Sequence, residues 1–236
     1  MIAVIGAGAM GEALMAGWIA AGTSPDEIVA VDQDTDRLAR LRERRGVRSV
    51  EVSGVSVAEV VVVAVKPHHV ATALTDIAPH LGPDAVVVSV AAGVTLARLT
   101  EVLPEGQPVI RVMPNTPALV GRGVAGLAAG PTVTPEQTAR VVAMMEAVGI
   151  CVELPESQFD ALTAISGSGP AYLFLIAEAM IEAGVHQGLG RDVATRLVNG
   201  TFAGAAAMLE GVEASATELR ERVTSPAGTT AAALRV

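Results

Sequence analysis

Residues 2–11 read IAVIGAGAMG, a strand-like apolar run followed at once by a Gly-x-Gly-x-x-Gly turn and the start of a helix-like run. At such a turn the first glycine permits a tight bend, the second lets the backbone approach a pyrophosphate, and the third lets the helix pack on the strand. The alternative is a glycine-rich turn of structural use only. We predict a dinucleotide-binding turn whose contact residues are Gly6, Ala7, Gly8, Ala9, Met10 and Gly11.

A second apolar run, residues 28–31, is followed by Asp32. This places an acid about 20 residues beyond the glycine turn, where it commonly accepts hydrogen bonds from the adenosine ribose. The helix after the turn offers free N–H groups and a positive dipole end to phosphates. Together these features predict binding of NAD(P)H, and they leave the acceptor of the hydride open.

The composition limits the kind of partner. Of the 236 residues, 51% are hydrophobic but only 2% are aromatic, so the core must consist of small aliphatic side chains and methionine. The formal net charge of −9 argues against a nucleic-acid partner, which needs a basic surface. The single cysteine, Cys151, excludes an intramolecular disulfide and a cysteine zinc cluster, and we expect it to be a small buried side chain.

No segment of the sequence predicts export or membrane insertion. The apolar residues 2–5 are interrupted by the glycine turn, and no basic segment precedes them. The most apolar later stretch, Ala171–Ala183, is too short to cross a bilayer and carries Glu178 and Glu182. We therefore expect a soluble, cytoplasmic protein without a membrane partner.

The first two-thirds of the chain alternates strand-like and helix-like runs. The strand-like runs are continuously apolar, which predicts a Rossmann-type, doubly wound α/β domain over residues 1–153 with a parallel sheet buried on both faces. Asp34 and Thr95 are predicted N-caps, and Gly22 and Gly46 are predicted helix stops. The expected strands are 2–5, 28–31, 60–65, 85–90, 109–112, 124–128 and 150–153, and the expected helices are 11–21, 34–45, 69–78, 96–102 and 135–148.

Residues 154–236 show helix-like runs only, over 159–165, 171–183, 192–210 and 217–223. The second of these runs is apolar on most sides, so it must be buried. About 80 residues of helix make a thin core by themselves. We therefore predict an all-α domain that forms a homodimer through this region.

Loops that follow the strands of a doubly wound sheet face the ligand crevice. Lys66 follows one strand and is suited to hold a phosphate, a ribose hydroxyl or a carboxylate, with a solvated surface lysine as the alternative. His68 and His69 are adjacent, so they make a poor metal pair and are expected in solvent; no metal site is predicted. The other predicted cofactor contacts in these loops are Ala64, Val65, Pro67, Ala91, Ala92, Gly93 and Asn115.

Two segments of the helical region differ from their surroundings. Residues 166–170 (SGSGP) open the apolar helix with small residues that allow a ligand to approach closely. In TSPAGTT, residues 224–230, the successive N–H groups of Gly228, Thr229 and Thr230 are predicted to form a nest for an anion such as a carboxylate. The alternatives are plain helix starts and a Ser-Pro turn.

The sequence marks out no general base beside either segment, and it lacks Ser-His-Asp, His-x-x-x-His and Gly-Lys-Ser/Thr patterns. This favours a reaction in which the substrate arrives ready to accept hydride. The protein then supplies position and electrostatics.

Six segments of the sequence carry a resemblance to a known family: residues 6–11, 65–67, 91–95, 113–117, 166–172 and 225–230. They occur in this order in the pyrroline-5-carboxylate reductases, which the chain resembles over essentially its whole length. The resemblance implies reduction of L-1-pyrroline-5-carboxylate to L-proline, the last step of proline biosynthesis, with NADPH or NADH. It also implies a homodimer of interlocking helical domains, and some members assemble five such dimers into a decamer.

The resemblance also implies roles for single residues. The nest at residues 228–230 binds the substrate carboxylate, the Thr230 hydroxyl approaches the ring nitrogen, and Glu213 lines the site. Ser166 and Ser168 lie near the nicotinamide and the substrate, and with Thr230 they are the expected catalytic residues. Because the helices of the family interlock, each site is expected to draw the turn that carries the two serines from the neighbouring subunit.

Three features depart from the family pattern. Members usually have glycine where this chain has Ala227, and a methyl group is unwelcome there if the backbone needs a positive φ. Glu51 stands where members often have an asparagine near the adenosine half of the nucleotide. Members continue past Val236 with another helix, so we expect this chain to be C-terminally truncated.

Two other functions compete with this interpretation. One is a related enzyme, such as a β-hydroxyacid dehydrogenase or an F420-dependent reductase. The dehydrogenases use a lysine of the second domain, and residues 154–236 contain no lysine. The other is a non-catalytic dinucleotide sensor, in which residues 166–172 and 225–230 are merely helix starts.

Charge and resemblance disagree on the cofactor. An acid at Asp32 repels a 2′-phosphate and favours NADH, whereas the family resemblance favours NADPH. Arg37 offsets the repulsion if it reaches back to Asp32, and Gln33 offers a hydrogen bond. We expect NADPH as the cofactor, with NADH also accepted.

Overall fold

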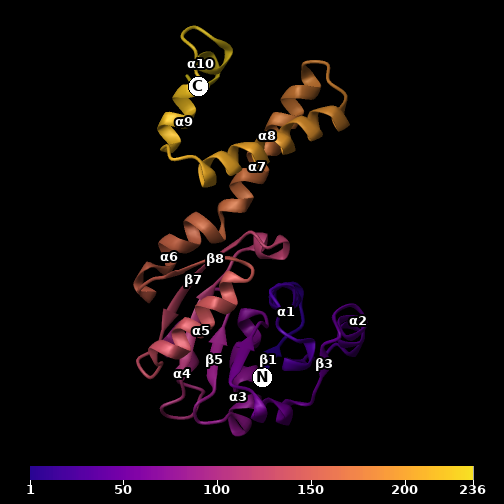
Figure 1. Cartoon of the computed structure of the whole chain (residues 1–236), viewed down its shortest axis with the longest axis vertical. Helices are drawn as coiled ribbons and strands as arrows, with labels where there is room; N and C mark the ends of the chain where they lie inside the picture. The colour runs from indigo at the N-terminus through magenta and orange to yellow at the C-terminus, as the bar shows by residue number, and fades with distance from the viewer. Residues whose placement is uncertain (236) are drawn as a thin grey trace. The chain divides into compact units, whose positions relative to one another are not determined.

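The computed structural model describes residues 1–235 and divides into two compact units (Figure 1). The first unit is Met1–Pro170, and the second begins at Ala171. The sequence places the domain boundary after residue 153, where strands give way to helices. The division by packing falls later because the first helical turns after that residue pack on the sheet.

The strands of the first unit are β1 (Ile2–Ile5), β2 (Ile28–Val31), β3 (Arg48–Ser49), β4 (Val60–Val63), β5 (Val86–Ser89), β6 (Val109–Met113), β7 (Gly123–Ala129) and β8 (Gly149–Glu153). Within the described residues they form one eight-stranded sheet in the order β3-β2-β1-β4-β5-β6-β7-β8. The order as far as β6 is that of doubly wound dinucleotide-binding sheets, whose crevice lies where the order reverses, at the carboxyl ends of β1 and β4. The predicted fold class is confirmed.

The helices of the first unit begin where the sequence marks their caps. The Asp34 side chain accepts a hydrogen bond from the Arg37 N–H, and the Thr95 side chain accepts one from the Arg98 N–H, so both predicted N-caps are confirmed. Gly46 ends its helix with a φ of 73°. The helices are α1 (Ala9–Ala20), α2 (Thr35–Arg45), α3 (Val70–Ile77), α4 (Leu96–Thr100), α5 (Pro135–Glu146) and α6 (Phe159–Leu162).

The central strands form because they are continuous runs of β-branched residues that are buried on both faces. All four residues of β4 are valines without exposed surface. Val60 and Val62 face one hydrophobic cluster, which includes residues of α1 and α5, whereas Val61 and Val63 face another, which includes residues of α3 and α4. Helices therefore cover both faces of the sheet, as a doubly wound fold requires.

Strand β7 departs from the expected parallel alternation, because it runs antiparallel to β6. The two strands are joined through a short 3₁₀ turn, η5 (Thr116–Val120), and no helix returns the chain to the other end of the sheet. The sequence pattern also misses β3, whose two residues are exposed and show no apolar run.

Cys151 lies on β8 and is partly buried. Burial raises the pKa of its thiol to about 11, and the nearby carboxylates of Glu146 and Glu153 act in the same direction. The thiol therefore stays protonated at neutral pH and is a poor nucleophile.

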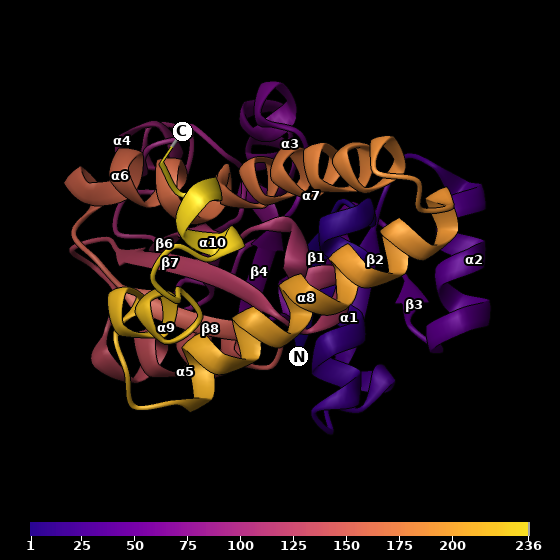
Figure 2. The ribbon, with the colours of Figure 1, turned by 90° about the horizontal axis from the view of Figure 1, so that it is seen from above.

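The second unit consists of helices with little core of their own. They are α7 (Gly169–His186), which begins at the end of the first unit, α8 (Arg191–Gly211), α9 (Ala216–Arg222) and α10 (Thr229–Ala233). Figure 2 shows α7 and α8 as the two long helices in orange. In the described part of these helices only Ala194 and Val198 are buried, whereas Phe174 is 68% exposed. An apolar helix surface of this kind needs another surface to cover it.

The apolar helical run is longer than its sequence pattern predicts. Helical turns continue from Glu156 to His186, a span of 31 residues that contains an 18-residue stretch with a mean hydropathy of 1.3, of which 6% is buried. By length and composition alone this run is able to cross a membrane, so the expectation that it is too short is wrong. The helix α7 extends beyond Ala171–Ala183 at both ends, and the turns of α6 and η7 precede it without a break.

Candidate functional site at the carboxyl ends of the strands

The glycine turn adopts the geometry that the sequence predicts. Gly6 has a φ of 98°, in the region that favours glycine, and its N–H donates to the Val31 carbonyl at 2.8 Å. A side chain at Gly11 would collide with the Gly6 carbonyl oxygen. Gly8, the N-cap of α1, has open space where a side chain would start. This leaves room for a ligand to approach the backbone at the α1 N-terminus.

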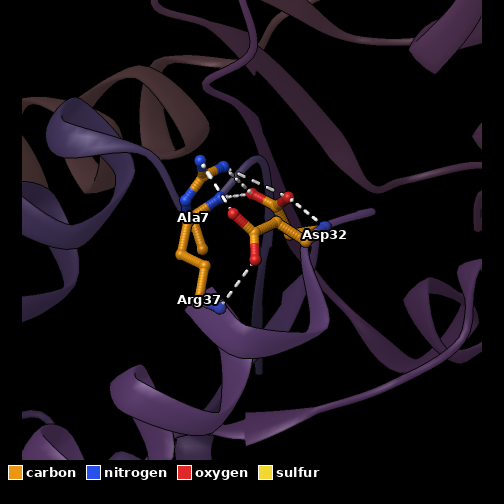
Figure 3. A network of polar contacts seen from close by, with 4 residues as sticks. Ala7, Asp32 and Arg37 are labelled. Carbon is orange, nitrogen blue, oxygen red and sulfur yellow. Dashed lines mark hydrogen bonds and ion pairs between the residues drawn. The ribbon is translucent and has the colours of Figure 1, made fainter.

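Asp32, directly after β2, is tied to the glycine turn (Figure 3). Its Oδ2 accepts a hydrogen bond from the Ala7 N–H at 2.7 Å, and its Oδ1 accepts one from the Asp34 N–H at 2.9 Å. The Arg37 guanidinium donates to both carboxylate oxygens, at 3.0 and 3.3 Å. The network holds the glycine turn, the end of β2 and the start of α2 in one arrangement.

The same network fixes the charge of Asp32. Partial burial opposes ionisation, but the hydrogen bonds from the backbone N–H groups of Asp34 and Ala7 and from Arg37 outweigh it and lower the pKa of Asp32 below its ordinary value. Asp32 is therefore a carboxylate at neutral pH, with the charge of Arg37 against it. Arg37 therefore reaches back to Asp32, as is needed for it to offset repulsion of a 2′-phosphate.

The other predicted cofactor contacts follow parallel strands, so they lie at the same edge of the sheet. Ala64 and Val65, after β4, lie close to the glycine turn. Lys66 is exposed and precedes the 3₁₀ turn η3 (Pro67–His69). After β5, Ala91 is buried and Gly93 has a φ of 76°. Pro67 and Ala92 are exposed in the same loops, and Ala9 and Met10 lie in the first turn of α1.

Asn115 follows β6 and is buried, with 7% of its surface exposed. Its side-chain Nδ2 donates to the Ser166 carbonyl at 2.9 Å, and its Oδ1 accepts from the Val124 N–H at 2.8 Å. The side-chain amide is thus engaged at both ends by the chain itself. Its contact with a cofactor stays a prediction.

The helix expected over residues 159–165 is present only in part. It begins as α6 and then becomes one turn of π-helix, η7 (Thr163–Gly167). The Ser168 N–H donates to the Thr163 carbonyl at 2.8 Å, five residues back, as a π-helix requires. The Ser166 hydroxyl donates to the Leu162 carbonyl at 3.0 Å. Single π turns inside helices are frequent at functional sites.

The turn that carries the two serines is bonded to its own chain. Asn115 holds the Ser166 carbonyl, and the Met113 side chain lies beside Gly167. The hydrogen bond places the turn at the carboxyl end of β6 within the first unit of its own chain. Which subunits combine to complete each substrate site stays a prediction. Ser166 and Ser168 lie in the same compact unit as the glycine turn.

Sequence reasoning missed a buried charge cluster on β6. Arg111 is 7% exposed, its guanidinium lies 2.8 Å from the Glu156 carboxylate, and it stacks 4.5 Å from the centre of the Phe159 ring. The same Glu156 oxygen accepts a hydrogen bond from the Leu96 N–H at 2.7 Å. The available signal was an arginine inside an apolar strand, since a buried charge requires a partner. The cluster fastens the start of the helical segment to β6 and α4.

In the second unit a tight turn precedes the predicted anion nest. The Gly228 N–H donates to the Ser225 carbonyl at 3.1 Å, and Pro226 and Ala227 are the central residues of the turn. Ala227 has a φ of 59°, and among the described residues it is the one non-glycine residue with a positive φ. Proline followed by a positive φ is the pattern of a type II turn, in which the second position favours glycine. The methyl group of Ala227 is therefore unfavourable there.

Helix α10 starts directly after this turn. Since the Gly228 N–H is taken by Ser225, the open donors of the nest are the N–H groups of Thr229 and Thr230, the first residues of the helix. Glu213 is exposed in the loop between α8 and α9. The structure brings residues 228–230 together at one helix start, and their roles toward a substrate stay predictions.

Comparison with known proteins covers both parts of the chain. A family model described as pyrroline-5-carboxylate reductase dimerisation matches residues 156–236, and one described as NADP oxidoreductase, coenzyme F420-dependent, matches residues 1–93. The pyrroline-5-carboxylate reductase of Mycobacterium tuberculosis H37Rv is 45% identical, over 99% of this chain and 88% of its own length. That of Escherichia coli K12 is 36% identical, over 100% of this chain and 88% of its own length.

Solved structures agree with these relatives. The structure of a pyrroline-5-carboxylate reductase from Coxiella burnetii matches with a TM-score of 0.92 at 38% identity, over 99% of this chain and 88% of that one. The Plasmodium falciparum pyrroline carboxylate reductase with NADP bound matches with a TM-score of 0.86 at 29% identity, over 99% and 87%. The F420-type match is confined to the first 93 residues, whereas these similarities extend over the whole chain. The chain is a member of the pyrroline-5-carboxylate reductase family.

Proposed function

We propose that this chain reduces L-1-pyrroline-5-carboxylate to L-proline with NAD(P)H. The observation that carries the proposal is the 45% identity to a pyrroline-5-carboxylate reductase over 99% of the chain. The dinucleotide turn with Asp32 in place supports it independently. The reaction adds hydride to the carbon of the ring C=N bond while the nitrogen keeps its proton, so L-proline forms without a covalent bond to the protein.

A nicotinamide dinucleotide fits the carboxyl edge of the sheet. The α1 N-terminus, with open space at Gly8, would hold the pyrophosphate, and Asp32 would accept hydrogen bonds from the adenosine ribose. The exposed Lys66 offers a further cation for the cofactor. The bound cofactor supplies the hydride.

Residues of the second unit are proposed to bind the substrate. The N–H groups of Thr229 and Thr230 would bind its carboxylate, the Thr230 hydroxyl would approach the ring nitrogen, and Glu213 would line the site. The Ser166 hydroxyl donates its hydrogen bond to the Leu162 carbonyl, so toward a ligand it would act as a hydrogen-bond acceptor. A protonated imine accepts hydride directly, so the protein supplies position rather than a general base.

The finer proposal is that NADPH is the main cofactor and that NADH is also accepted. The Asp32 carboxylate disfavours a 2′-phosphate, and the Arg37 guanidinium 3.0 Å away offsets that repulsion. Arg37→Ala therefore lowers kcat/KM about 10-fold with NADPH and much less with NADH, since about 1.4 kcal/mol corresponds to a factor of ten. Arg40→Ala, an exposed charge on the same helix, serves as the control. Equal losses with the two cofactors contradict this role for Arg37.

We also propose a cytoplasmic homodimer, assembled as a decamer of five dimers, whose partners are small molecules and neither nucleic acid nor membrane. The exposed apolar surface of α7, including Phe174 and Leu175, supports assignment of this helix to a subunit interface. The net charge of −9 supports the absence of a nucleic-acid partner. Light scattering coupled to gel filtration measures the assembly, and a monomer contradicts the proposal.

The central experiment is a spectrophotometric assay with the purified protein. Pyrroline-5-carboxylate is added to parallel tubes with NADPH and with NADH, and the loss of reduced-nicotinamide absorbance is recorded. Oxidation in the presence of substrate, with formation of proline, is expected. If neither cofactor is oxidised by a protein that binds both, the reductase function is refuted and the dinucleotide sensor is favoured.

Thr230→Val tests the assignment of the substrate loop. The variant loses the hydroxyl but keeps the backbone N–H, so KM for pyrroline-5-carboxylate rises or kcat falls while the Kd for NADPH is retained. Thr217→Val, which removes an exposed hydroxyl from α9, is the matched control. Kinetics like those of Thr217→Val remove Thr230 from the site.

A further inference from the structure

Asn115 joins three parts of the first unit through one side chain. It stands after β6, accepts from the Val124 N–H in β7 at 2.8 Å, and donates to the Ser166 carbonyl in the π turn at 2.9 Å. Asn115 itself is 7% exposed, and both hydrogen bonds are at least partly buried. A buried partner left without its bond carries the full cost of desolvation, so the side chain strongly favours this one arrangement.

The segment that Asn115 holds has an alternative path. A π turn includes one residue more than an α turn, and such turns are rare inside helices. Contacts from outside the helix include the Asn115 bond to Ser166, the Met113 side chain beside Gly167 and packing against β7. Without them, residues 163–167 are free to wind as α-helix, which would turn the two serines to a different direction.

We propose that Asn115 is a positioning residue: it holds the π turn and thereby sets the place of Ser166 and Ser168 for hydride transfer. This inference rests on the proposed function, which assigns those serines to the reaction site. Because Asn115 acts through the turn, its loss affects kcat, whereas a residue that binds the cofactor directly affects the Kd for NADPH.

A matched control lies at the opposite end of the same strand. Gln107 precedes β6, is 5% exposed, and its side-chain Nε2 donates to the carbonyls of Gly82 and Ala85. It is also a buried side-chain amide that joins separate backbone segments. It lies at the amino end of β6, away from the edge that carries the glycine turn.

The experiment compares Asn115→Asp with Gln107→Glu. Each substitution replaces an NH₂ donor by an oxygen of the same size, and Asn115→Asp keeps the acceptor for the Val124 N–H while setting an oxygen against the Ser166 carbonyl. For both variants kcat, KM for pyrroline-5-carboxylate, the Kd for NADPH and Tm are measured.

We expect Asn115→Asp to lower kcat by roughly 10- to 100-fold, since small displacements of positioned groups cost that much. Its Kd for NADPH stays within about 3-fold of the wild type, a difference of under 1 kcal/mol. Gln107→Glu lowers Tm and leaves kcat unchanged. The proposal is overturned if Asn115→Asp loses only Tm, as the control does, or if its loss appears in the Kd for NADPH and not in kcat.

Hydrogen exchange gives a second measurement that needs no activity. Asn115→Ser, which removes the bond without adding charge, is used beside Asn115→Asp in case the latter does not fold. Amide exchange in residues 163–170, including the Ser168 N–H, is expected to become at least about 10-fold faster, while the strands keep their protection. Unchanged exchange there overturns the proposal. If the wild-type protein fails to reduce pyrroline-5-carboxylate, the proposed function fails, and the exchange data still decide whether Asn115 holds the turn.

Discussion

The two units of the molecule differ in what holds them together. In the first unit the strand β4 is fully buried. Two polar side chains of the same unit, Asn115 and Arg111, are also almost inaccessible to water. In the second unit the long helices leave Phe174 and its apolar neighbours exposed, and the ion pair between Arg191 and Glu182 lies at the surface. The first unit buries its own hydrophobic core, whereas the second unit leaves most of its apolar side chains exposed. Substitutions of the same kind should therefore have different consequences in the two units.

The largest effect is expected from a charge on the exposed apolar surface of α7. Phe174→Glu places a carboxylate where the proposed dimer buries a ring, so the dimer dissociates and activity is lost. Sedimentation velocity at micromolar concentration measures the assembly. Thr75→Glu, an exposed site on α3, is the control and stays dimeric. A dimeric Phe174→Glu protein shows that this surface is covered by something other than a second subunit.

An ion pair in each unit gives the next comparison. Glu156→Ala leaves Arg111 buried without its carboxylate and removes the acceptor of the Leu96 N–H, so the free energy of unfolding falls by about 3 kcal/mol. Glu182→Ala breaks the exposed pair with Arg191 and leaves stability unchanged within error. Denaturant unfolding measures both. If the two substitutions lower the free energy of unfolding equally, the buried ion pair of the first unit is no more important for stability than the exposed pair of the second.

A smaller effect, of opposite sign, is expected at Ala227. Ala227→Gly removes the cost of a methyl group at a φ of 59°, which outweighs the extra freedom of glycine in the unfolded chain, so stability rises by roughly 0.5–1 kcal/mol. Gly228→Ala, one residue on, acts in the other direction because its new methyl group would lie 2.5 Å from the Ser225 hydroxyl oxygen. Thermal unfolding of the three proteins measures the order. A less stable Ala227→Gly protein contradicts the strain at this turn.

The smallest effect concerns pH in the first unit. The pKa of Asp32 is lower in the folded than in the unfolded chain, so its contribution to stability is present above the unfolded value and is lost as the pH falls through the folded one. Asp32→Asn lacks this contribution. The difference in Tm between the wild type and Asp32→Asn is therefore largest near neutral pH and shrinks below about pH 4. A difference that stays unchanged as the pH falls well below that value contradicts a stabilising contribution from the ionised Asp32 carboxylate.

The local features of the fold were predictable from the sequence, and the long-range contacts were not. β1 and β2 end where a glycine turn and an acid interrupt an apolar run, and the caps at Asp34 and Thr95 act over three residues, so each signal lies within its own element. The glycine turn and Asp32 were found in the same way.

The remaining features depend on residues far apart in the chain. β7 runs antiparallel to β6 because no crossover helix joins the two strands. The residue pattern within β6 or β7 does not indicate which way the strand runs. The bonds from Asn115 to Ser166 and from Arg111 to Glu156 each join one loop or strand to a helix that comes much later. The π turn depends on those contacts, so the helical pattern of residues 159–165 alone predicts only a regular helix.

The reversal of β7 also bears on the order in which the chain folds. Met113 pairs with Gly126 across a short connection, whereas parallel pairs such as Ile5 with Val63 must close much longer loops. Because the entropy cost of closure grows with loop length, and local contacts form faster, we expect β6 and β7 to pair before most of the sheet is assembled. Arg111 and Asn115 are then already ordered when Glu156 and Ser166 bind to them. The contacts that attach the helical segment to the sheet would therefore form on the part of the chain that folds first.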